Sequence, residues 1–325
     1  MSEPFRIGKL PGVVLRRVFF NMALFELINL SQCSNKTKSL INAWNIRHLE
    51  LHVNLCYDYF VRVSEFVTSN RYLTKSQQFQ CNTANPVTQY LDTELSVERV
   101  LTLIERINSV FKAEIKSLKI TPNGLENQMR MIIDRILNIQ KAIDSCEILG
   151  NDTSINTHHL ILRSFKFREI IDRIHEYQEQ FSMRGIPCEI LSIEHSNWFQ
   201  ISQLLESRVC TKIQLKRSSF ESGDFNEFLR EWVVGALPNL LFLSIESNYK
   251  RDMDVVMEGL EVAPDTTEFQ GRPHECFSGT EQHIINGQYI RRVDGTVATF
   301  HFRETPILAL SNYFIFEFAL LRVDN

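Results

Sequence analysis

The residues of this chain that could do chemistry form one histidine and cysteine group and one histidine pair. His274, Cys276 and His283 could bind a metal ion or hold a reactive thiol. One cysteine and two histidines on a loop more often have no such role, so we predict no site there. His158 and His159 are adjacent, so their side chains point to opposite faces of a strand or lie about 100° apart on a helix. We therefore expect no shared ligand at this pair.

Motifs for catalysis are missing from the sequence. It has no phosphate-binding glycine loop, no G-x-S-x-G and no H-E-x-x-H. The 7 cysteines are odd in number and show no C-x-x-C spacing, which argues against a disulfide framework and a zinc site. We therefore expect no enzyme activity of its own, no cofactor and no metal.

Composition narrows the possible partners and the location. The chain has 325 residues and a net charge of −4, without the basic stripe that nucleic-acid binding requires. Arg16 and Arg17 interrupt the N-terminal apolar run, which argues against a secretory signal. No apolar stretch reaches the ~20 residues of a membrane helix. We expect an intracellular protein, cytoplasmic or nuclear or both, that binds neither nucleic acid nor membrane.

The elements that must position any functional residue alternate along most of the chain. Strand-like runs occupy residues 48–55, 115–120, 145–149, 187–193, 210–215 and 240–245. Residues 97–111 and 167–181 have apolar side chains at helical spacing, and the polar segment 74–89 is typical of a loop. Strands that alternate with helices predict an α/β fold with parallel strands. Their irregular spacing favours a leucine-rich-repeat-like βα stack that ends in a β-hairpin region.

The first 48 residues predict a different module, made of three short helices. Pro11 suits the first turn of a helix, and Ser34 is a good N-cap for the third helix. Three helices in about 40 residues bury little apolar surface on their own, so this module needs a partner. It is also cationic, because only Glu3 and Glu26 oppose its basic residues, which are Arg6, Lys9, Arg16, Arg17, Lys36, Lys38 and Arg47.

The pattern of this module consists of Leu10-Pro11, Val14-Leu15, Val18-Phe19, Met22, Glu26-Leu27, Leu30 and Cys33-Ser34. It resembles the F-box, the motif that binds the Skp-family adaptor of cullin-based SCF ubiquitin ligases. Gly12 and Val13 depart from the polar residues that many members have after the proline. The resemblance implies that residues 4–48 are an F-box and that its partners are the adaptor and, through it, a cullin. We expect the adaptor to contact Leu10, Pro11, Val14, Leu15, Val18, Phe19, Met22, Leu27, Leu30 and Cys33. In the isolated chain we expect only partial burial for seven of them: Leu10, Pro11, Leu15, Val18, Phe19, Leu27 and Leu30.

A second stretch resembles the type 2 F-box-associated domain of nematode F-box proteins. It includes a helix with Phe225, Phe228 and Trp232, then Gly235 and Pro238, and it continues to a predicted hairpin. In that hairpin Asp294-Gly295 suits a two-residue type I′ turn. The resemblance implies that residues 208–302 form this domain within a leucine-rich-repeat-like substrate-binding region, residues 49–325.

Together these observations predict the substrate-recognition subunit of an SCF-type E3 ligase, which bridges the adaptor and an unknown protein substrate. The alternative is a scaffold that binds the adaptor without ubiquitin-ligase output. Side chains that alternate with the buried strand positions should face the target. Among them we expect Phe242 to anchor the target, with Lys216 and Glu246 at its rim.

Overall fold

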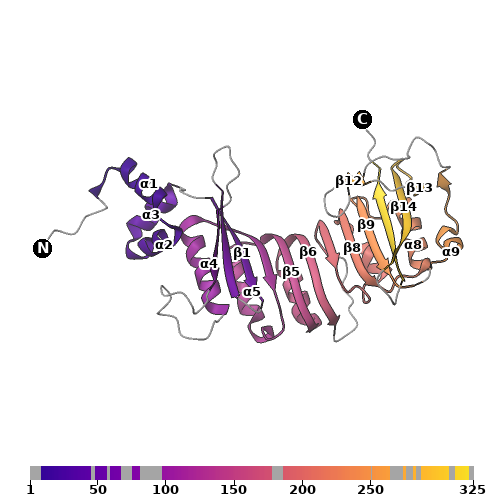
Figure 1. Cartoon of the computed structure of the whole chain (residues 1–325), viewed down its shortest axis with the longest axis horizontal. Helices are drawn as coiled ribbons and strands as arrows, with labels where there is room; N and C mark the ends of the chain where they lie inside the picture. Colours follow the sequence, from indigo (N-terminus) through magenta and orange to yellow (C-terminus); the bar gives the residue numbers. More distant parts are fainter. Residues whose placement is uncertain are drawn as a thin grey trace. The chain divides into compact units, whose positions relative to one another are not determined.

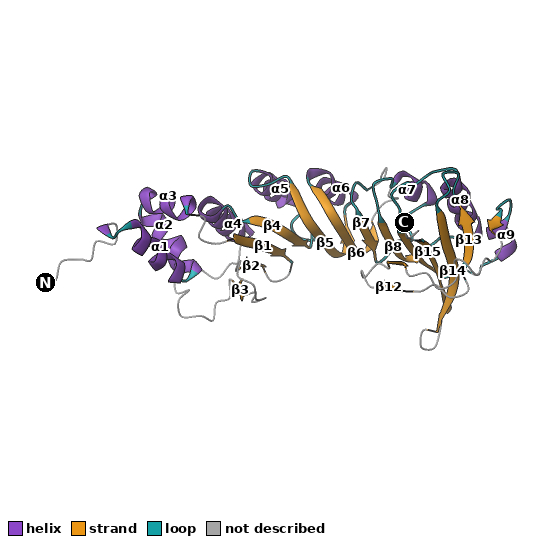
Figure 2. Cartoon of the chain, turned by 90° about the horizontal axis from the view of Figure 1, so that it is seen from above, coloured by secondary structure: helices purple, strands orange, loops and turns teal. Residues whose placement is uncertain are grey.

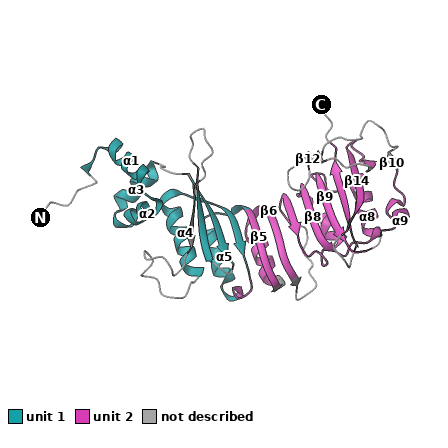
Figure 3. Ribbon diagram, viewed as in Figure 1, with its two compact units in different colours: residues 1–121, 127–144 teal, residues 122–126, 145–325 magenta. Residues whose placement is uncertain are grey.

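The structure is a computed structural model that describes residues 9–44, 48–56, 59–66, 75–80, 97–177, 186–249, 251–263, 274–275, 281–282, 287–306 and 312–321. Figure 1 gives the course of the chain. It divides into two compact units (Figure 3): unit 1 has residues 1–121 and 127–144, and unit 2 has residues 122–126 and 145–325. The division falls near the start of strand β5.

Unit 1 begins with three helices and continues into a small sheet. Its elements are α1 (Gly12–Asn21), α2 (Leu24–Cys33), α3 (Asn35–Ala43), β1 (His48–Leu55), β2 (Tyr59–Phe66), β3 (Lys75–Gln80), α4 (Val97–Phe111), β4 (Glu114–Ile120) and α5 (Met129–Leu137). The strands lie in the order β3-β2-β1-β4. The pair β1 and β4 is parallel, and the other two pairs are antiparallel. Residues 75–80 therefore form an edge strand, where a loop was expected.

Helix α4 links the N-terminal helices to this sheet. Its buried side chains are the seven apolar residues whose spacing predicts one face: Val97, Val100, Leu101, Ile104, Ile107, Val110 and Phe111. The helix contacts α2 and α3 as well as β1 and β2. The three short helices thus gain from α4 part of the burial that they cannot supply themselves.

Unit 2 is a wider sheet with helices on one face (Figure 2). Its first part contains β5 (Ala142–Thr153), α6 (Ile155–Ser164), β6 (Lys166–Tyr177), β7 (Ile190–Ile193), α7 (Ile201–Glu206), β8 (Lys212–Ser218), α8 (Ser222–Val233) and β9 (Phe242–Ser247). Strands β6, β7, β8 and β9 pair in parallel, with α7 and α8 in the two later crossovers. The predicted α/β class is confirmed for this part of the chain.

The sheet of unit 2 continues beyond β9 with antiparallel strands. After β9 come α9 (Met253–Met257), β10 (Val262–Ala263), β11 (His274–Glu275), β12 (Glu281–Gln282), β13 (Gln288–Arg291), β14 (Val297–Pro306) and β15 (Asn312–Leu320). The order is β10-β13-β14-β15-β9-β8-β7-β6-β5, and β11 and β12 form a separate pair. The last long strand, β15, therefore lies between β9 and β14.

Aromatic side chains fill the space between α8 and the antiparallel strands. Phe228 and Trp232 of α8 meet Phe318 of β15 edge to face, with ring centroids 5.2 Å and 5.1 Å away. Phe225 lies 4.9 Å from Phe316 between ring centroids. All five side chains are buried, and such pairs add roughly 0.5–1.5 kcal/mol each beyond their area. This cluster is the core of the second half of unit 2.

The segment 167–181 corrects a prediction, because residues 166–177 form strand β6 and not a helix. Ile170, Asp172 and Ile174 alternate as buried residues, while Arg173 and His175 are exposed. Asp172 is a charged residue at a position that faces the core, so the strand period is hidden in the sequence. The apolar residues at 167, 170, 171 and 174 then match a helical spacing by coincidence.

Two turns position the strands around α8. Gly235 has φ +107° after α8 and donates its amide to Trp232, while Ala236 donates to Glu231, which is a Schellman motif. The hairpin between β13 and β14 differs from the predicted two-residue turn. The Arg292 amide donates to the Thr296 carbonyl at 2.8 Å and Gly295 has φ +89°, so the loop has three residues. The Gly295 amide donates to the Arg292 carbonyl at 2.9 Å, so the glycine closes a β-turn, as is common in three-residue hairpin loops.

Candidate functional site

Local interactions fix the three N-terminal helices. Pro11 precedes α1, and its carbonyl accepts the Leu15 amide at 3.0 Å. The Ala23 amide donates to the Glu26 carboxylate at 2.7 Å and so satisfies a backbone group at the start of α2. Ser34 accepts the Thr37 amide through its side chain, as predicted for the N-cap of α3. Local interactions of the sequence therefore define where each of the three helices begins.

Part of the predicted contact set forms the interior of this module. Leu15, Phe19 and Leu27 are 4 %, 1 % and 0 % exposed, which corrects the expectation that they remain partly open. Phe19 lies 5.8 Å from Trp44 between ring centroids. These side chains form the core that holds the three helices together. Because they are buried there, they cannot contact a partner unless the helices rearrange.

The remaining predicted contact residues lie nearer the surface. Pro11, Val14 and Cys33 are exposed, and the half-buried ones are Leu10, Val18, Met22 and Leu30. All of them belong to α1, α2, the segment just before α1 or the turn between the two helices. Their contact with an adaptor remains a prediction.

The structure adds three exposed apolar side chains that the sequence reasoning missed. Val13 is 84 % exposed, Phe20 57 % and Phe25 47 %, beside Val14 at 46 %. We call these four residues the N-terminal apolar patch. The sequence spacing could have indicated part of this patch. Val13 and Phe20 are seven residues apart, so they lie on the same side of α1. Leu15 and Phe19 are four residues apart and lie on its buried side. Exposed large apolar side chains on two consecutive short helices indicate a protein interface.

Exposed basic side chains lie in the same N-terminal module as this patch. Arg16 and Arg17 lie on α1 between Val14 and Phe20, and both are exposed. Lys9 and Lys36 are exposed as well. An apolar patch with a cationic surround favours a partner with an acidic rim, because charges at a rim guide association.

Comparison with known families agrees with this geometry. Residues 7–49 match the F-box domain family, and residues 185–245 match the family described as F-box associated. The chain contains an F-box domain and an F-box-associated region. It is also similar to the Skn-1 dependent zygotic transcript 15 protein of Caenorhabditis elegans, with 19 % identity over 91 % of this chain and 93 % of the relative. No solved structure gives a significant match.

The F-box match covers α1, α2 and α3, and the F-box-associated match covers β7, α7, β8, α8 and most of β9. The F-box match contains the residues that carry the first resemblance. The F-box-associated match ends at residue 245, so it includes Phe225, Phe228, Trp232, Gly235 and Pro238 of the second resemblance but not the predicted hairpin at Asp294-Gly295. The nematode F-box architecture predicted from those residues is confirmed in this form.

The predicted target face of β8 and β9 is only partly as expected. Lys216 and Glu246 are half-buried, and the Lys216 ammonium lies 2.8 Å from the Glu194 carboxylate. Phe242 is 3 % exposed, which corrects its assignment as an accessible anchor. Both faces of β9 are covered at this position, because Phe242 and the core residue Leu243 are both buried next to β15. An inner strand that is buried on both faces shows no alternation of exposure.

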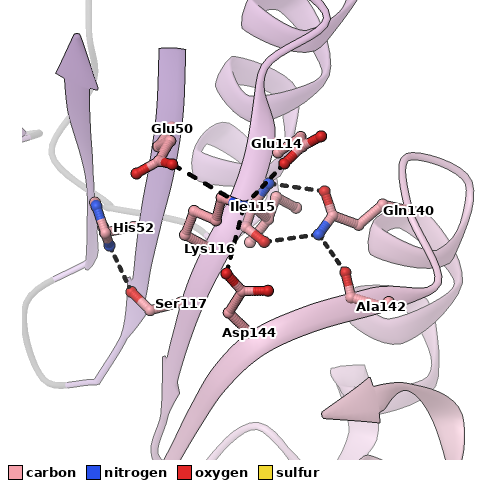
Figure 4. A network of polar contacts seen from close by, with 9 residues as sticks. All are labelled: Glu50, His52, Glu114, Ile115, Lys116, Ser117, Gln140, Ala142 and Asp144. Carbon is pink, nitrogen blue, oxygen red and sulfur yellow. Dashed lines mark hydrogen bonds and ion pairs between the residues drawn. The ribbon is translucent and has the colours of Figure 1, made fainter. Parts of the chain in front are cut away.

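A network of polar contacts covers part of the unit 1 sheet (Figure 4). The Lys116 ammonium lies 3.0 Å from the Glu114 carboxylate, 3.3 Å from Asp144 and 4.0 Å from Glu50. These contacts, first of all the hydrogen bond to Glu114, raise the pKa of Lys116. Lys116 is an extra residue in the pairing of β4 with β1, a β-bulge that places it beside Ser117 on one face.

Further polar contacts in Figure 4 involve strands β1 and β4. The Gln140 side chain accepts the Ile115 amide at 2.7 Å and donates to the Ile115 carbonyl at 2.6 Å. A His52 ring nitrogen lies 2.8 Å from the Ser117 hydroxyl. Exposed ion pairs stabilise a fold by at most about 1 kcal/mol each, so we assign this network to strand register.

The residue types of a catalytic triad meet in the interior of unit 2, but without access. His158 lies 3.0 Å from Asp172 between Nε2 and Oδ2, and both side chains are at most 2 % exposed. Asp172 also accepts the Ile174 amide at 3.0 Å. Burial, and then the charges of Asp172 and Glu147, raises the pKa of the Cys146 thiol. A protonated and inaccessible thiol is a poor nucleophile, so this cluster is structural.

The other candidate groups for chemistry are also accounted for. The Cys188 thiol has a raised pKa because of its hydrogen bond to Cys210 and its burial. Within the described residues, no three histidine, cysteine or acidic side chains are placed to share a metal ion. Cys276 and His283 lie outside the described residues, as does the side chain of His274. No described helix is long and apolar enough to cross a membrane.

Several histidines share a pKa shift of the same sign. Burial lowers the pKa of these side chains below the ordinary value, and their neighbouring charges modify the effect. They are His52, His159, His195 and His301.

Proposed function

We propose that this F-box protein is the substrate-recognition subunit of an SCF-type ubiquitin ligase. In this proposal residues 4–48 bind a Skp-family adaptor, which in turn binds a cullin. Residues 49–325, including an F-box-associated domain at 208–302, hold the target protein. The observation that carries the proposal is the N-terminal apolar patch, because it lies on the same helices that match the F-box domain.

The energetics of the N-terminal module support adaptor binding. The interior of the module is already filled by Leu15, Phe19 and Leu27, so the patch is surplus apolar surface. Burying such a surface against a partner contributes about 25 cal/mol for each Å² removed from water. The four side chains of the patch are therefore suited to the centre of an interface, with the basic residues around them at its rim.

The chain would contribute no reactive group to ubiquitin transfer. A substrate receptor accelerates the reaction by holding the target near a charged conjugating enzyme, so that a bimolecular step becomes effectively intramolecular. The buried state of Cys146 and of the His158–Asp172 pair agrees with this non-catalytic role. Our proposed location for target contacts is the face of the unit 2 sheet that carries no helices (Figure 2), and we expect Lys216 and Glu246 to contribute to it.

A co-purification experiment tests the proposal. Replacement of Leu10 and Pro11 together with alanine should abolish recovery of the adaptor, because both lie at the open start of α1. The melting temperature of residues 50–325 should stay within about 2 °C. Recovery of the adaptor within about threefold of the unchanged chain would contradict the F-box assignment.

A second readout separates a ligase subunit from a scaffold. A ligase subunit should bring down the cullin together with the adaptor, and it should increase ubiquitin attached to trapped proteins. Recovery of the adaptor without the cullin would favour the scaffold. The control is a known F-box protein that recovers both the adaptor and the cullin under the same conditions.

A further inference from the structure

Three basic side chains form a stack where strands β6, β7 and β8 end. His175 is near the end of β6, His195 follows β7, and Arg217 is near the end of β8. The two imidazole rings have centroids 3.8 Å apart. One guanidinium nitrogen of Arg217 lies 3.3 Å from both ring nitrogens of His195. Equal distances place it over the ring face, since an in-plane position would clash with the carbon between those nitrogens.

The chain bends to bring Arg217 to this place. The pairing of β8 with β9 shifts register between Leu215 and Ser218, which is a bulge that contains Arg217. Arg217 has φ +50°, a left-handed conformation that residues with a side chain rarely adopt. Strain of about 1–3 kcal/mol at such a position is most often found at functional sites. Glycine would relieve it, so the arginine side chain needs another explanation.

Basic residues near the stack differ from Arg217, because each of them forms an ion pair with a carboxylate. Lys216 is paired with Glu194 at 2.8 Å, and Arg173 with Glu147 at 3.3 Å. Within the described residues, Arg217 has no carboxylate within ion-pair distance, and it is exposed. The stack therefore has hydrogen-bond donors that no carboxylate of the described residues neutralises. It lies where parallel strands end, which is a common place for ligands to bind in α/β proteins.

Several charged groups surround the central imidazole of the stack. The pKa of His195 is lowered first by burial, then by His175 and by Arg217, while Glu194 and Asp172 oppose the shift. His195 is therefore mostly neutral at pH 7, and an anion at the stack would favour its protonated form. Proton uptake on binding makes affinity rise as pH falls.

We propose that His175, His195 and Arg217 form a binding site for an oxyanion carried by the target protein, and that its affinity increases at acidic pH. The free edge of the Arg217 guanidinium suits two oxygens of one group, the protonated His195 ring donates one further hydrogen bond, and a ring N–H of His175 can donate another. A group with two negative charges, such as a phosphate ester, matches the three donors better than a single carboxylate. This inference rests on the proposed role of unit 2 in target binding.

Sulfate is the first probe, because its charge is constant between pH 5.5 and 7.5. We expect calorimetric titration of the full chain to give saturable sulfate binding against a chloride background of equal ionic strength. The affinity should increase about tenfold per pH unit for each proton taken up. Phosphate and acetate arms then distinguish a dianionic group from a carboxylate, with acetate expected to bind at least tenfold more weakly.

Arg217→Gly is the decisive variant, because glycine accepts the positive φ. It should melt at the same or a higher temperature than the unchanged chain, yet bind sulfate at least tenfold more weakly. His195→Phe should keep a stacked ring and lose the pH dependence. Arg173→Ala is the matched control, since it removes a guanidinium from the same strand as His175 and should leave sulfate binding within twofold.

Capture of target proteins separates this site from adaptor binding. Arg217→Gly should recover the adaptor normally and lose trapped proteins, whereas the Leu10 and Pro11 double variant should lose the adaptor and still bind sulfate. The inference is overturned if sulfate binds no better than chloride, if Arg217→Gly binds sulfate normally, or if that variant is destabilised. It is also overturned if target capture is unchanged by Arg217→Gly.

Discussion

Phe19 and Phe20 are adjacent in the sequence but should respond in opposite ways to replacement by alanine. Phe20 is 57 % exposed, whereas Phe19 is 1 % exposed and contacts Trp44. Removal of Phe20 should cost the fold less than about 1 kcal/mol, because its ring is already largely in water. Removal of Phe19 should cost about 3–5 kcal/mol and unfold the N-terminal module.

The effect on adaptor binding follows from the exposed area of Phe20. A phenylalanine that buries about 200 Å² has roughly 110 Å² still open at this exposure. At about 25 cal/mol per Å², covering it contributes roughly 2–3 kcal/mol, which is about 30- to 150-fold in affinity.

The assay is titration of purified adaptor with the Phe20→Ala chain, together with its circular dichroism melt. Phe20→Leu is the matched control and should weaken binding by less than about fivefold. An affinity within threefold for Phe20→Ala would refute the assignment of the patch as the adaptor interface. A loss of binding that accompanies unfolding would also refute the reasoning, since it would mean that Phe20 belongs to the core.

Three further predictions concern stability. Asp172→Ala removes the carboxylate that lies 3.0 Å from the buried His158 and should lower the free energy of unfolding by about 3–5 kcal/mol in urea titrations, and a loss below 1 kcal/mol would show that the pair is not needed. Gly235→Ala should lower the free energy of unfolding by about 1 kcal/mol or more, because φ is +107° at this position. No atom lies within 4 Å of the added carbon, so the cost comes from the backbone conformation and not from a clash. Gly235→Asn should cost less, because asparagine tolerates this conformation better than alanine. The histidines with lowered pKa values stay neutral to a lower pH in the folded chain than in the unfolded chain, so the unfolded chain binds more protons as the pH falls through the ordinary value of 6.5. The melting temperature should therefore fall between pH 7 and pH 5.5, and an unchanged or rising value would contradict these shifts.

The sequence is most informative where one periodicity dominates. The apolar spacing of residues 97–111 identifies both helix α4 and all its buried residues, and residues 48–55 coincide with β1. It is least informative at β6, where one buried carboxylate hides the alternation. The partner that makes Asp172 acceptable in the interior, His158, is on α6, and only the fold brings them together.

The two candidate sites could be predicted to different extents. The F-box helices were recognisable, but their apolar residues are on both sides of α1, so spacing alone did not separate core from surface. On β9 the error has another cause. Strand β15 comes more than 60 residues later in the sequence and pairs with β9 to leave Phe242 buried. The stack of His175, His195 and Arg217 brings together side chains from the ends of three strands, and it depends on a β-bulge at Arg217. No local sequence pattern predicts this bulge.

The late position of β15 has a consequence for synthesis on the ribosome. Strand β9 ends at Ser247 and β15 begins at Asn312, so the intervening residues must be translated before the two can pair. At about 5–20 residues per second this takes roughly 3–13 s. During that interval Phe228 and Trp232 lack their partner Phe318, and one edge of β9 is open to other strands. The nascent chain should therefore depend on chaperones at this stage, and a premature stop before β15 should yield an insoluble product even though the residues that match the F-box-associated family are complete.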